Sequence, residues 1–442
     1  MQYTIRQQIG TAPHTHQLYI DDNLRVLTEH ATKPFLPTPD IVYIDPPYNT
    51  QKSFVYDDQQ SQDTWSNDMI VRIQHIHAWL PPHGILLIHI DEHEYANLFR
   101  IVANIFHPSN DLGTIIWDKI IPKGDSRGIS CHHEPIIAFA KHAPTALAHH
   151  PFSFPKPIDP ILRKAQQLHQ RIGKKIVPPE LLESIRLYGL DINPKDHAIT
   201  LTHDTAQRLF RQWLNTQNIK PGLKLYNQLD DQGIPYRPCT MAWPNHQRPP
   251  DKYFAPLIHP ITQKPCPVPA RGWRNPPDTM KRLLDTNNIV FGKDETTQPQ
   301  RILRITDNTH DPFPSIIPCP NTDATLMRKL GIPFDTPKPV ALQQRIIAGI
   351  LGDSGGTVAD IYAGSGTIGH ACMRLQQSGI PVQSILMQSP EPFNNTPTGR
   401  QAAQYCRTHR ITPCISSLTI ERLARCIAQE SLPSGWSIWE KE

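Results

Sequence analysis

The amino-acid sequence predicts an α/β fold in which an open, largely parallel sheet is covered by helices on both faces. Two stretches, residues 1–141 and 336–442, alternate short apolar segments with amphipathic helical patterns. Strands and helices that alternate at this spacing are typical of parallel strands joined by helical crossovers. The chain of 442 residues is also long enough for two or three cores. We therefore expect the two stretches to be halves of one sheet.

The elements of these two stretches follow from their hydrophobic periodicity. In the first stretch, strands are expected at residues 17–20, 40–45, 84–91, 113–119 and 135–141. Helices are expected between them at residues 23–30, 69–80 and 95–106. The last stretch resumes the pattern with a helix at 339–351, a strand and helix within 357–377, and a strand at 383–388.

The middle of the chain, residues 142–335, has a different texture. Short polar helical patterns at 159–189 and 205–217 are followed by a proline-rich, basic and aromatic stretch at 236–277. An insertion of this length with helices of its own is more typical of a domain than of a loop. Its lower content of apolar residues predicts that more of this segment lies on the surface than in a hydrophobic core.

Charge, cysteines and hydropathy narrow the classes of protein. The 44 Lys and Arg against 40 Asp and Glu give a net charge of only +4, so nucleic-acid binding would need a local patch. The eight cysteines form no C-x-x-C pair and are interpreted as reduced cytosolic thiols. His132 and His133 have no third ligand at suitable spacing, so no metal site is expected. No run approaches the roughly 18 apolar residues of a membrane helix, and we expect a cytoplasmic protein without membrane contact.

The segment IVYIDPPYNT, residues 41–50, permits two interpretations. In the structural one, Pro46 and Pro47 end a strand and Tyr48 packs on the core. In the functional one, the stiff turn exposes the Asp45 carboxylate and the Pro46 carbonyl at the sheet edge where ligands bind. Because proline has no N–H, the turn offers only acceptors beside an aromatic face. Such a site suits an amino group on a flat heterocycle.

The segment DIYAGSGTIGHA, residues 360–371, predicts a strand, a tight glycine turn and a helix that starts near Thr367. Gly364 and Gly366 allow positive φ and a close backbone approach, so bare N–H groups and a helix N-terminus can face a ligand. Glycines also occur in such turns for packing alone. Taken alone, the segment is equally consistent with cofactor binding and with a structural turn.

The order of these motifs resembles that of the amino-methylating DNA methyltransferases. The resemblance covers most of the chain and is carried by the segments DPPYNT, FVYDD, HGILLIHIDEHEYANLFRIVANIF, GTIIWDK, HEPIIAFAK, DTPKPVALQQRII, DIYAGSGTIGHA and ILMQSPEP. Within that family the chain is similar to the permuted, beta-type branch, and most similar to the modification subunits of type III restriction systems. The resemblance implies a Rossmann-like methyltransferase domain with a mixed, mostly parallel sheet and permuted motif order. It implies a catalytic half at 1–141, an inserted target-recognition domain at 142–335 and a cofactor-binding half at 336–442.

The resemblance also assigns roles to the D-P-P-Y turn. Asp45 and the Pro46 carbonyl would accept hydrogen bonds from the exocyclic amino group of a base, Pro47 would stiffen the turn, and Tyr48 would stack on the flipped ring. Two acceptors on the amino protons favour a pyramidal nitrogen whose lone pair points at the methyl donor. Catalysis would then consist of positioning and electrostatics.

For S-adenosylmethionine, the resemblance implies a set of binding residues in four segments. The set consists of Asp22, Lys338, Asp360, Tyr362, Ala363, Gly364, Ser365, Gly366, Thr367 and Gln388. Asp22 would contact the adenine of the cofactor, although an N-cap role is an equal alternative. Lys338, in Thr336–Pro339, would lie near the methionine carboxylate, and without the family context it would be a surface lysine. Gln388 stands where many relatives carry a ribose-binding glutamate, with Glu391 as the second candidate.

The inserted domain would carry target recognition. Cations and aromatics that could contact phosphates and bases are Lys252, Tyr253, Lys264, Arg271, Trp273 and Arg274. Each is also compatible with an ordinary surface or packing role, and the segment RGWR with bracing the domain.

The function expected from these features is methylation of adenine in double-stranded DNA in a bacterial cytoplasm, at the nucleoid. The aspartate that opens the D-P-P-Y motif favours adenine over cytosine, for which relatives more often begin with serine. The alternatives are methylation of the exocyclic amino group of cytosine in DNA, a DNA-recognition subunit that needs a partner for activity, and an enzyme that acts on RNA or on a protein amide. A restriction subunit and a second copy of the chain are the further partners that the resemblance suggests.

Overall fold

The computed structural model describes residues 3–10, 13, 15–49, 61–120, 129–320, 323–334 and 337–442. The segment FVYDD and Thr336 lie outside these residues. The chain divides into two compact units. The first unit comprises Met1–Phe154 and Pro312–Glu442, and the second unit comprises Pro155–Asp311.

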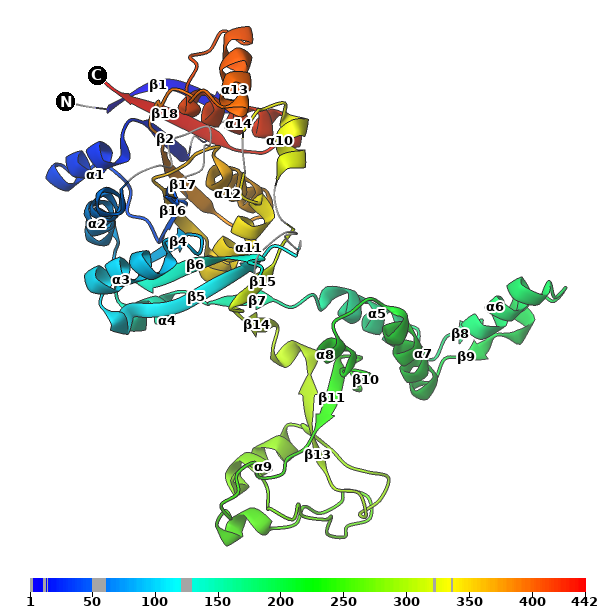
Figure 1. Ribbon diagram of the computed structural model, residues 1–442. Coiled ribbons are helices and arrows are strands. Elements are labelled where there is room, and N and C mark those ends of the chain that lie inside the picture. The colour runs from blue at the N-terminus through cyan, green and yellow to red at the C-terminus, as the bar shows by residue number, and fades with distance from the viewer. Residues whose placement is uncertain are drawn as a thin grey trace. The chain divides into compact units, whose positions relative to one another are not determined.

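A mixed, mostly parallel sheet forms the centre of the first unit (Figure 1). In the described part of the chain its ten strands lie in the order β1 (Tyr3–Gly10), β18 (Gly435–Lys441), β2 (His16–Ile20), β17 (Val382–Met387), β16 (Gly356–Asp360), β3 (Ile41–Ile44), β4 (Ile85–His89), β6 (His133–Ala140), β5 (Asp111–Asp118) and β15 (Ile316–Pro318). The strands from β18 to β4 run parallel, β15 is parallel to β5, and β1, β6 and β5 supply the antiparallel pairings. The predicted α/β fold class is confirmed.

The pairing of β3 with β16 brings together the two motifs. Val358 lies opposite Ile41 and Ala359 opposite Val42 in this parallel pair. Both strands therefore end at the same edge of the sheet, although more than three hundred residues separate them. The D-P-P-Y turn and the glycine turn follow directly from these two ends.

Helices cover both faces of the sheet, as the alternating pattern of β3 requires. Val42 and Ile44 face a core that includes α1 (Asn23–Thr32), α2 (Gln62–Trp79) and α3 (Tyr95–Phe106). Ile41 and Tyr43 face the opposite core with α11 (Val340–Leu351), α12 (Thr367–Gln377) and α14 (Ile415–Glu430). The remaining α-helices of this unit are α4 (Ala143–His149), α10 (Ala324–Leu330) and α13 (Pro397–Thr408).

The second unit is shorter at both ends than the expected insertion of residues 142–335. Ala143 and Ala146 of α4 pack in the core of the first unit, as does Ile317 of β15, so these flanking segments belong to the sheet domain. The chain passes between the units at the paired strands β7 (Ser153–Pro155) and β14 (His310–Pro312).

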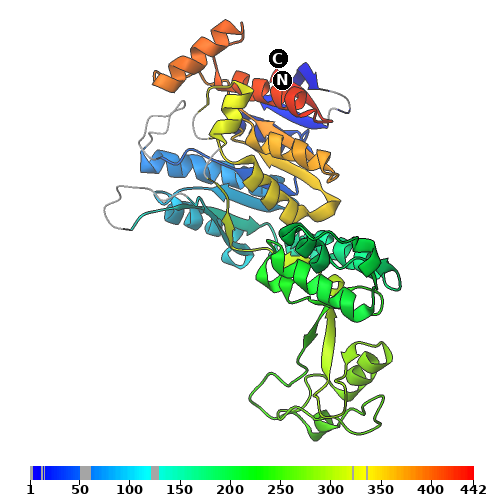
Figure 2. The ribbon, with the colours of Figure 1, turned by 90° about the vertical axis from the view of Figure 1, so that its right-hand side faces the viewer.

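Two small cores build the second unit. One lies between α5 (Asp159–His169) and α7 (His203–Thr216), and the other packs around Trp273 and α9 (Pro277–Asp285). A four-stranded sheet with the order β10 (Gln228–Leu229), β11 (Pro235–Cys239), β13 (Gln300–Arg304) and β12 (Ile289–Val290) joins them. In Figure 2 the paired strands β11 and β13 lead to a loop-rich segment that contains α9. The other elements are β8 (Lys175–Ile176), α6 (Pro179–Tyr188), β9 (Ile199–Thr200) and α8 (Pro221–Lys224).

Several elements were not predicted from the sequence. β1 is an edge strand with mostly exposed side chains, so it has no apolar run. β18, α13 and α14 were also missed, and α2 begins at Gln62, before the expected residue 69. The polar first turns of α2 hide its start, which Ser61 caps by accepting the N–H of Thr64. Among the described residues, none of the helices is both long enough and apolar enough to span a membrane.

Candidate active site

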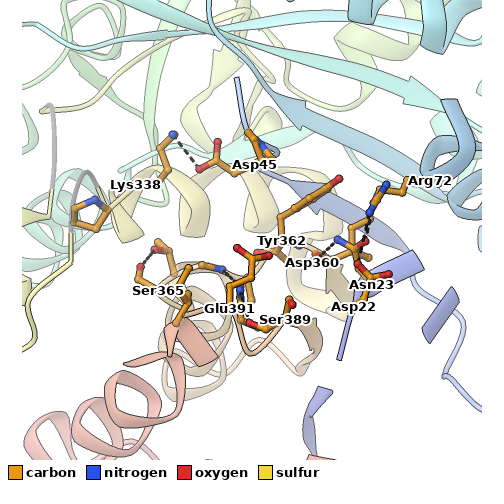
Figure 3. A pocket seen from close by; sticks show the side chains of 18 of the residues that line it. Asp22, Asn23, Asp45, Arg72, Lys338, Asp360, Tyr362, Ser365, Ser389 and Glu391 are labelled. Carbon is orange, nitrogen blue, oxygen red and sulfur yellow. Dashed lines mark hydrogen bonds and ion pairs between the residues drawn. The ribbon is translucent and has the colours of Figure 1, made fainter. Parts of the chain in front are cut away.

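A pocket of about 320 Å³ lies where β3 and β16 end (Figure 3). Its lining combines the end of β3, the glycine turn after β16, the start of α1, one face of α2 and the segment before α11. In open parallel sheets, ligands bind at the carboxyl ends of two neighbouring strands whose following segments pass to opposite faces of the sheet. The pocket is therefore the candidate active site.

Asp45 is the carboxylate at the end of β3, and two donors already contact it. Its Oδ1 accepts a hydrogen bond of 2.6 Å from the Tyr48 hydroxyl. Its Oδ2 lies 3.0 Å from Nζ of Lys338, whose ammonium also sits 4.8 Å from the centre of the Tyr48 ring. Each carboxylate oxygen has two lone-pair directions, so Asp45 can accept a further donor from the pocket.

Hydrogen bonds to neighbouring elements stabilise the D-P-P-Y turn. The indole N–H of Trp65, on α2, donates to the carbonyl of Pro47 at 2.8 Å. Asn49 has a φ of 55° and donates to the Glu94 carboxylate at 3.1 Å. These contacts fix the loop on both sides of Tyr48, so the stiffness of the two prolines is reinforced by tertiary bonds.

Glu134 joins Lys338 to the sheet. Its Oε2 lies 3.7 Å from Nζ of Lys338, and Oε1 pairs with Lys119. Burial alone would raise the pKa of Glu134, but the charge of Lys338, followed by His89 and Lys119, lowers that pKa to about 2. Glu134 is therefore ionised at neutral pH and helps to keep the Lys338 ammonium beside Asp45.

The glycine turn after β16 has the backbone that the sequence predicted. Gly364 and Gly366 have φ values of 51° and 82°, in the left-handed region. Gly366 is the N-cap of α12, and among the described residues no side chain caps this helix. The positive end of the α12 dipole therefore faces the pocket without an internal carboxylate.

Gln388 stabilises this turn from the end of β17. Its side-chain oxygen accepts the N–H of Gly364 at 2.7 Å, and its amide donates to the Ser389 carbonyl at 3.1 Å. Both polar ends of Gln388 are thus used within the chain, and its place in the structure is that of a brace for the turn. The Glu391 carboxylate also lines the pocket (Figure 3).

Asp360 lies at the end of β16 beneath the pocket. The residue is 4% exposed, and Oδ1 accepts the N–H of Tyr362 at 2.9 Å. Burial raises the pKa of the Asp360 carboxyl to about 8; the Tyr362 N–H opposes this shift and the charge of Asp45 adds to it. The carboxyl is therefore mostly protonated at neutral pH.

The structure shows the N-cap role of Asp22 and places the residue at the pocket. It caps α1 by accepting the N–H of Arg25 at 3.1 Å, and it also lines the pocket. The neighbouring residue Asp21 is buried and accepts a hydrogen bond from the Tyr3 hydroxyl at 2.9 Å.

One face of α2 was missed by the sequence analysis. Trp65, Met69, Asp68 and Arg72 line the pocket, and Arg72 donates to the Asn23 side chain at 2.7 Å (Figure 3). Their i and i+4 spacing places them on one helix face, which is the signal that could have identified them. The two turn motifs alone do not reveal this face because the contact is tertiary.

The structure brings the predicted catalytic and cofactor residues together around this pocket. Asp22, Asp45, Pro47, Lys338, Asp360, Tyr362, Ala363, Gly364, Ser365, Thr367 and Gln388 line it. Tyr48 contacts the lining residue Asp45, while Pro46 and Gly366 are buried in the two turns.

The six residues predicted to contact DNA lie in the second unit, between β11 and β13. Lys252, Arg271 and Arg274 are exposed, and Tyr253 is half-buried. Lys264 is exposed and forms an ion pair of 3.0 Å with Glu295. Trp273 differs from the expectation of a surface contact, because it is 2% exposed and its indole donates to the Ala255 carbonyl at 2.8 Å. In this structure the indole is part of a small hydrophobic core and braces the segment.

Replacing Trp273 with alanine is expected to destabilise the second unit by about 3–5 kcal/mol, since a large buried side chain leaves a cavity. Chemical denaturation of the full chain, with limited proteolysis of the loop-rich segment, measures this loss. The matched control is Arg271→Ala, which removes an exposed side chain two residues away and should change the stability by no more than about 0.5 kcal/mol. Unchanged unfolding of Trp273→Ala together with weaker DNA binding would instead make the indole a DNA contact.

Comparison with models of protein families shows the family to which the chain belongs. The model of the N6/N4 methyltransferase family, described as DNA methylase, matches residues 39–385. This range contains both turns and most of the sheet, and the chain belongs to the DNA methylase family.

Two curated relatives are modification subunits of type III restriction-modification enzymes. The EcoP15I Mod subunit of Escherichia coli is 26% identical over 99% of this chain and 67% of its own length. The StyLTI Mod subunit of Salmonella typhimurium is 25% identical over 94% of this chain, which spans only 58% of that protein. The type II methyltransferase M.KpnI of Klebsiella pneumoniae is 24% identical over 86% of this chain and 82% of its own.

Solved structures also match. TTHA0409 from Thermus thermophilus, complexed with S-adenosyl-L-methionine, is 12% identical with a TM-score of 0.37 and covers 96% of this chain and 99% of its own. The PvuII cytosine-N4-specific DNA methyltransferase is 10% identical with a TM-score of 0.37, over 95% of this chain and 96% of its own.

Proposed function

We propose that this protein transfers a methyl group from S-adenosylmethionine to the exocyclic amino group of adenine in double-stranded DNA. The observation that carries the proposal is the position of Asp45 at the end of β3, across one pocket from the glycine turn at the end of β16. An amino-group acceptor and a cofactor turn thus share one cavity.

The pocket residues fit S-adenosylmethionine. The left-handed glycines let the backbone approach a ligand closely, and a Cβ on Gly364 would meet no atom nearer than 3.8 Å, so the conformation and not the space requires glycine there. The uncapped start of α12 suits the carboxylate of the ligand, and Tyr362 offers an aromatic plane. When bound, this ligand supplies an electrophilic methyl group on a sulfonium.

The residues of the chain would activate the amino group by position. Asp45 and the Pro46 carbonyl would accept hydrogen bonds from its two N–H groups. These bonds would direct the nitrogen lone pair at the methyl carbon. The lone pair forms the new N–C bond while the S–C bond breaks and its electrons stay on sulfur, giving S-adenosylhomocysteine. The extra proton on nitrogen then leaves to Asp45 or to water.

The base must leave the duplex to reach this pocket, and Tyr48, which contacts the lining residue Asp45, would stack on it. The aromatic ring replaces part of the stacking that the base loses. The bond from the Tyr48 hydroxyl to Asp45 and the bond from Trp65 to Pro47 hold the ring and the acceptor in one array. Exposed cations of the second unit, such as Arg271 and Arg274, would contact the phosphates.

The relatives that are named Mod subunits of type III restriction-modification enzymes support a restriction subunit as a partner of this chain. A second copy of the chain is a further proposal, which rests on the family resemblance alone. A subunit that recognises DNA but depends on a partner for catalysis is the second candidate, and the ion-paired Asp45 and the intact glycine turn argue against it.

Incubation of the purified full chain with methyl-labelled S-adenosylmethionine and separate DNA, RNA and protein acceptors tests the function. We expect label in duplex DNA alone, and recovery of N6-methyladenine after digestion to nucleosides. Label in N4-methylcytosine would correct the base, and label in RNA or protein would correct the substrate class. Binding of the cofactor without label in any acceptor would favour the recognition subunit.

A further inference from the structure

Arg422, on α14, lies directly behind the glycine turn. The side chain is fully buried, with an exposed fraction of 0%. Its Nη1 donates to Oγ of Ser365 at 2.5 Å and to Oγ1 of Thr367 at 2.8 Å. Ser365 and Thr367 line the pocket, whereas Arg422 does not. The guanidinium therefore acts on the pocket through two hydroxyl groups.

The hydrogen bonds of Arg422 restrict the directions in which the Ser365 and Thr367 hydroxyl groups can donate. The two hydroxyl oxygens are 3.2 Å apart, so one of them can donate to the other. Each hydroxyl has a single proton and two lone pairs. Because both oxygens accept from Arg422 and one proton is used between them, one O–H remains to donate toward the pocket. The arrangement is a polarised donor that suits an anion.

Among the described residues Arg422 forms no ion pair with a carboxylate, although the Cys426 side chain and the Asp323 carboxylate interact with its charge. Its Nε and Nη2 have no hydrogen-bond partner in the portion of the chain that the structure describes. The Glu430 carboxylate, on the same helix, is used by Arg374 at 2.7 Å and by His370 at 3.1 Å. A buried cation without a paired anion is costly, and the uncapped start of α12 adds partial positive charge at the same place.

The other cation at this end of the pocket is already paired. Figure 3 shows Lys338 and Ser365 on the same side of the cavity, with Lys338 turned toward Asp45. Lys338 lies 3.0 Å from Asp45 and 3.7 Å from Glu134. We expect an incoming carboxylate to meet the hydroxyl pair and the helix start, where Arg422 and the α12 dipole supply positive charge.

We propose that Arg422 is a positioning residue that aims the Ser365 and Thr367 hydroxyls at the α-carboxylate of the cofactor. The inference rests on the proposed function, since it requires a ligand with the amino-acid part of S-adenosylmethionine. It makes α14 a determinant of cofactor affinity through a residue that does not touch the ligand.

Binding of two nucleosides to the full chain tests the role of Arg422. S-Adenosylhomocysteine carries the α-carboxylate, whereas 5′-methylthioadenosine has the same adenosine and sulfur without it. For Arg422→Met we expect calorimetry to show at least a tenfold loss of affinity for S-adenosylhomocysteine and less than a twofold change for methylthioadenosine. Arg425→Met is the matched control, because Arg425 lies on the same helix and its guanidinium pairs with Glu421 at 3.1 Å. This variant should leave the affinities for both nucleosides unchanged.

Equal losses for both nucleosides in a folded Arg422→Met protein would overturn the inference, because Arg422 would then only brace the turn. If this variant does not fold, the double variant Ser365→Ala and Thr367→Val takes its place. It must show the same selective loss, and equal losses or none would also overturn the inference. A wild-type protein that binds neither nucleoside would contradict the proposed function itself.

Discussion

Replacing Asp45 with alanine is expected to lower the rate of methyl transfer to DNA by about 100-fold to 1000-fold, the range for loss of one preorganised hydrogen-bonding group at a reacting centre. Asp45 is the charged acceptor at the end of β3, and without it the amino group of the base loses one of its two anchors. In the proposed reaction Asp45 contacts the base and not the adenosine of the cofactor. Affinity for S-adenosylhomocysteine should therefore change by no more than about threefold, while single-turnover transfer of label shows the full loss.

The matched control for this experiment is Asp63→Ala, which removes an exposed carboxylate from the first turn of α2. This variant should retain transfer within about twofold of the wild type, because surface charges remote from the site contribute little. Label transfer by Asp45→Ala at the wild-type rate, with the variant folded, would remove the D-P-P-Y turn from the mechanism.

The stability of the first unit is expected to fall as the pH rises from about 4 to about 8, because of Asp360. Its pKa is 3.8 in the unfolded chain and about 8 in the folded one, so in this window the folded state binds more protons than the unfolded state. Each pH unit then costs up to about 1.4 kcal/mol of unfolding free energy from this group. The contribution is fully present below the unfolded pKa and is lost as the pH passes the folded pKa.

Asp360→Asn should remove this dependence, because an amide mimics the neutral carboxyl and can still accept the Tyr362 N–H. Chemical denaturation at pH 4, 6 and 8 should show the variant gaining stability over the wild type by several kcal/mol with rising pH. Asp353→Asn, which changes an exposed carboxyl just before β16, controls for the chemical substitution. Parallel curves for the wild type and Asp360→Asn would show that Asp360 is not protonated in the folded protein.

Local sequence patterns predicted the elements that form the sheet. β3, β4 and β17 are short apolar runs, and a strand of this kind needs only its own residues to be recognised. The two turns were also readable, because prolines and left-handed glycines restrict the backbone wherever they occur. β1 and the start of α2 were missed because their exposed, polar residues carry no hydrophobic period.

The sequence also identified candidate residues without determining their contacts. Trp273 stands between two arginines, which favours a nucleic-acid contact, yet its indole is buried against Ala255. Gln388 was expected at the ribose; it lines the pocket, and its side-chain oxygen also accepts the N–H of Gly364 in the glycine turn while its amide donates to the Ser389 carbonyl. In both cases the residue type was informative, but its direction depends on neighbours that are far away in the chain.

What the sequence determined by itself is the family, the α/β class and the two rigid turns, since each depends on residues that are adjacent in the chain. Only the tertiary structure decided that β3 and β16 are neighbours, that Lys338 reaches Asp45, and that the buried Arg422 reaches the turn while Arg425 stays half-buried at 27% side-chain exposure. The physical reason is that hydrophobic periodicity encodes which face of an element is buried. It does not encode which other element covers that face, and that pairing sets the distances on which the chemistry depends.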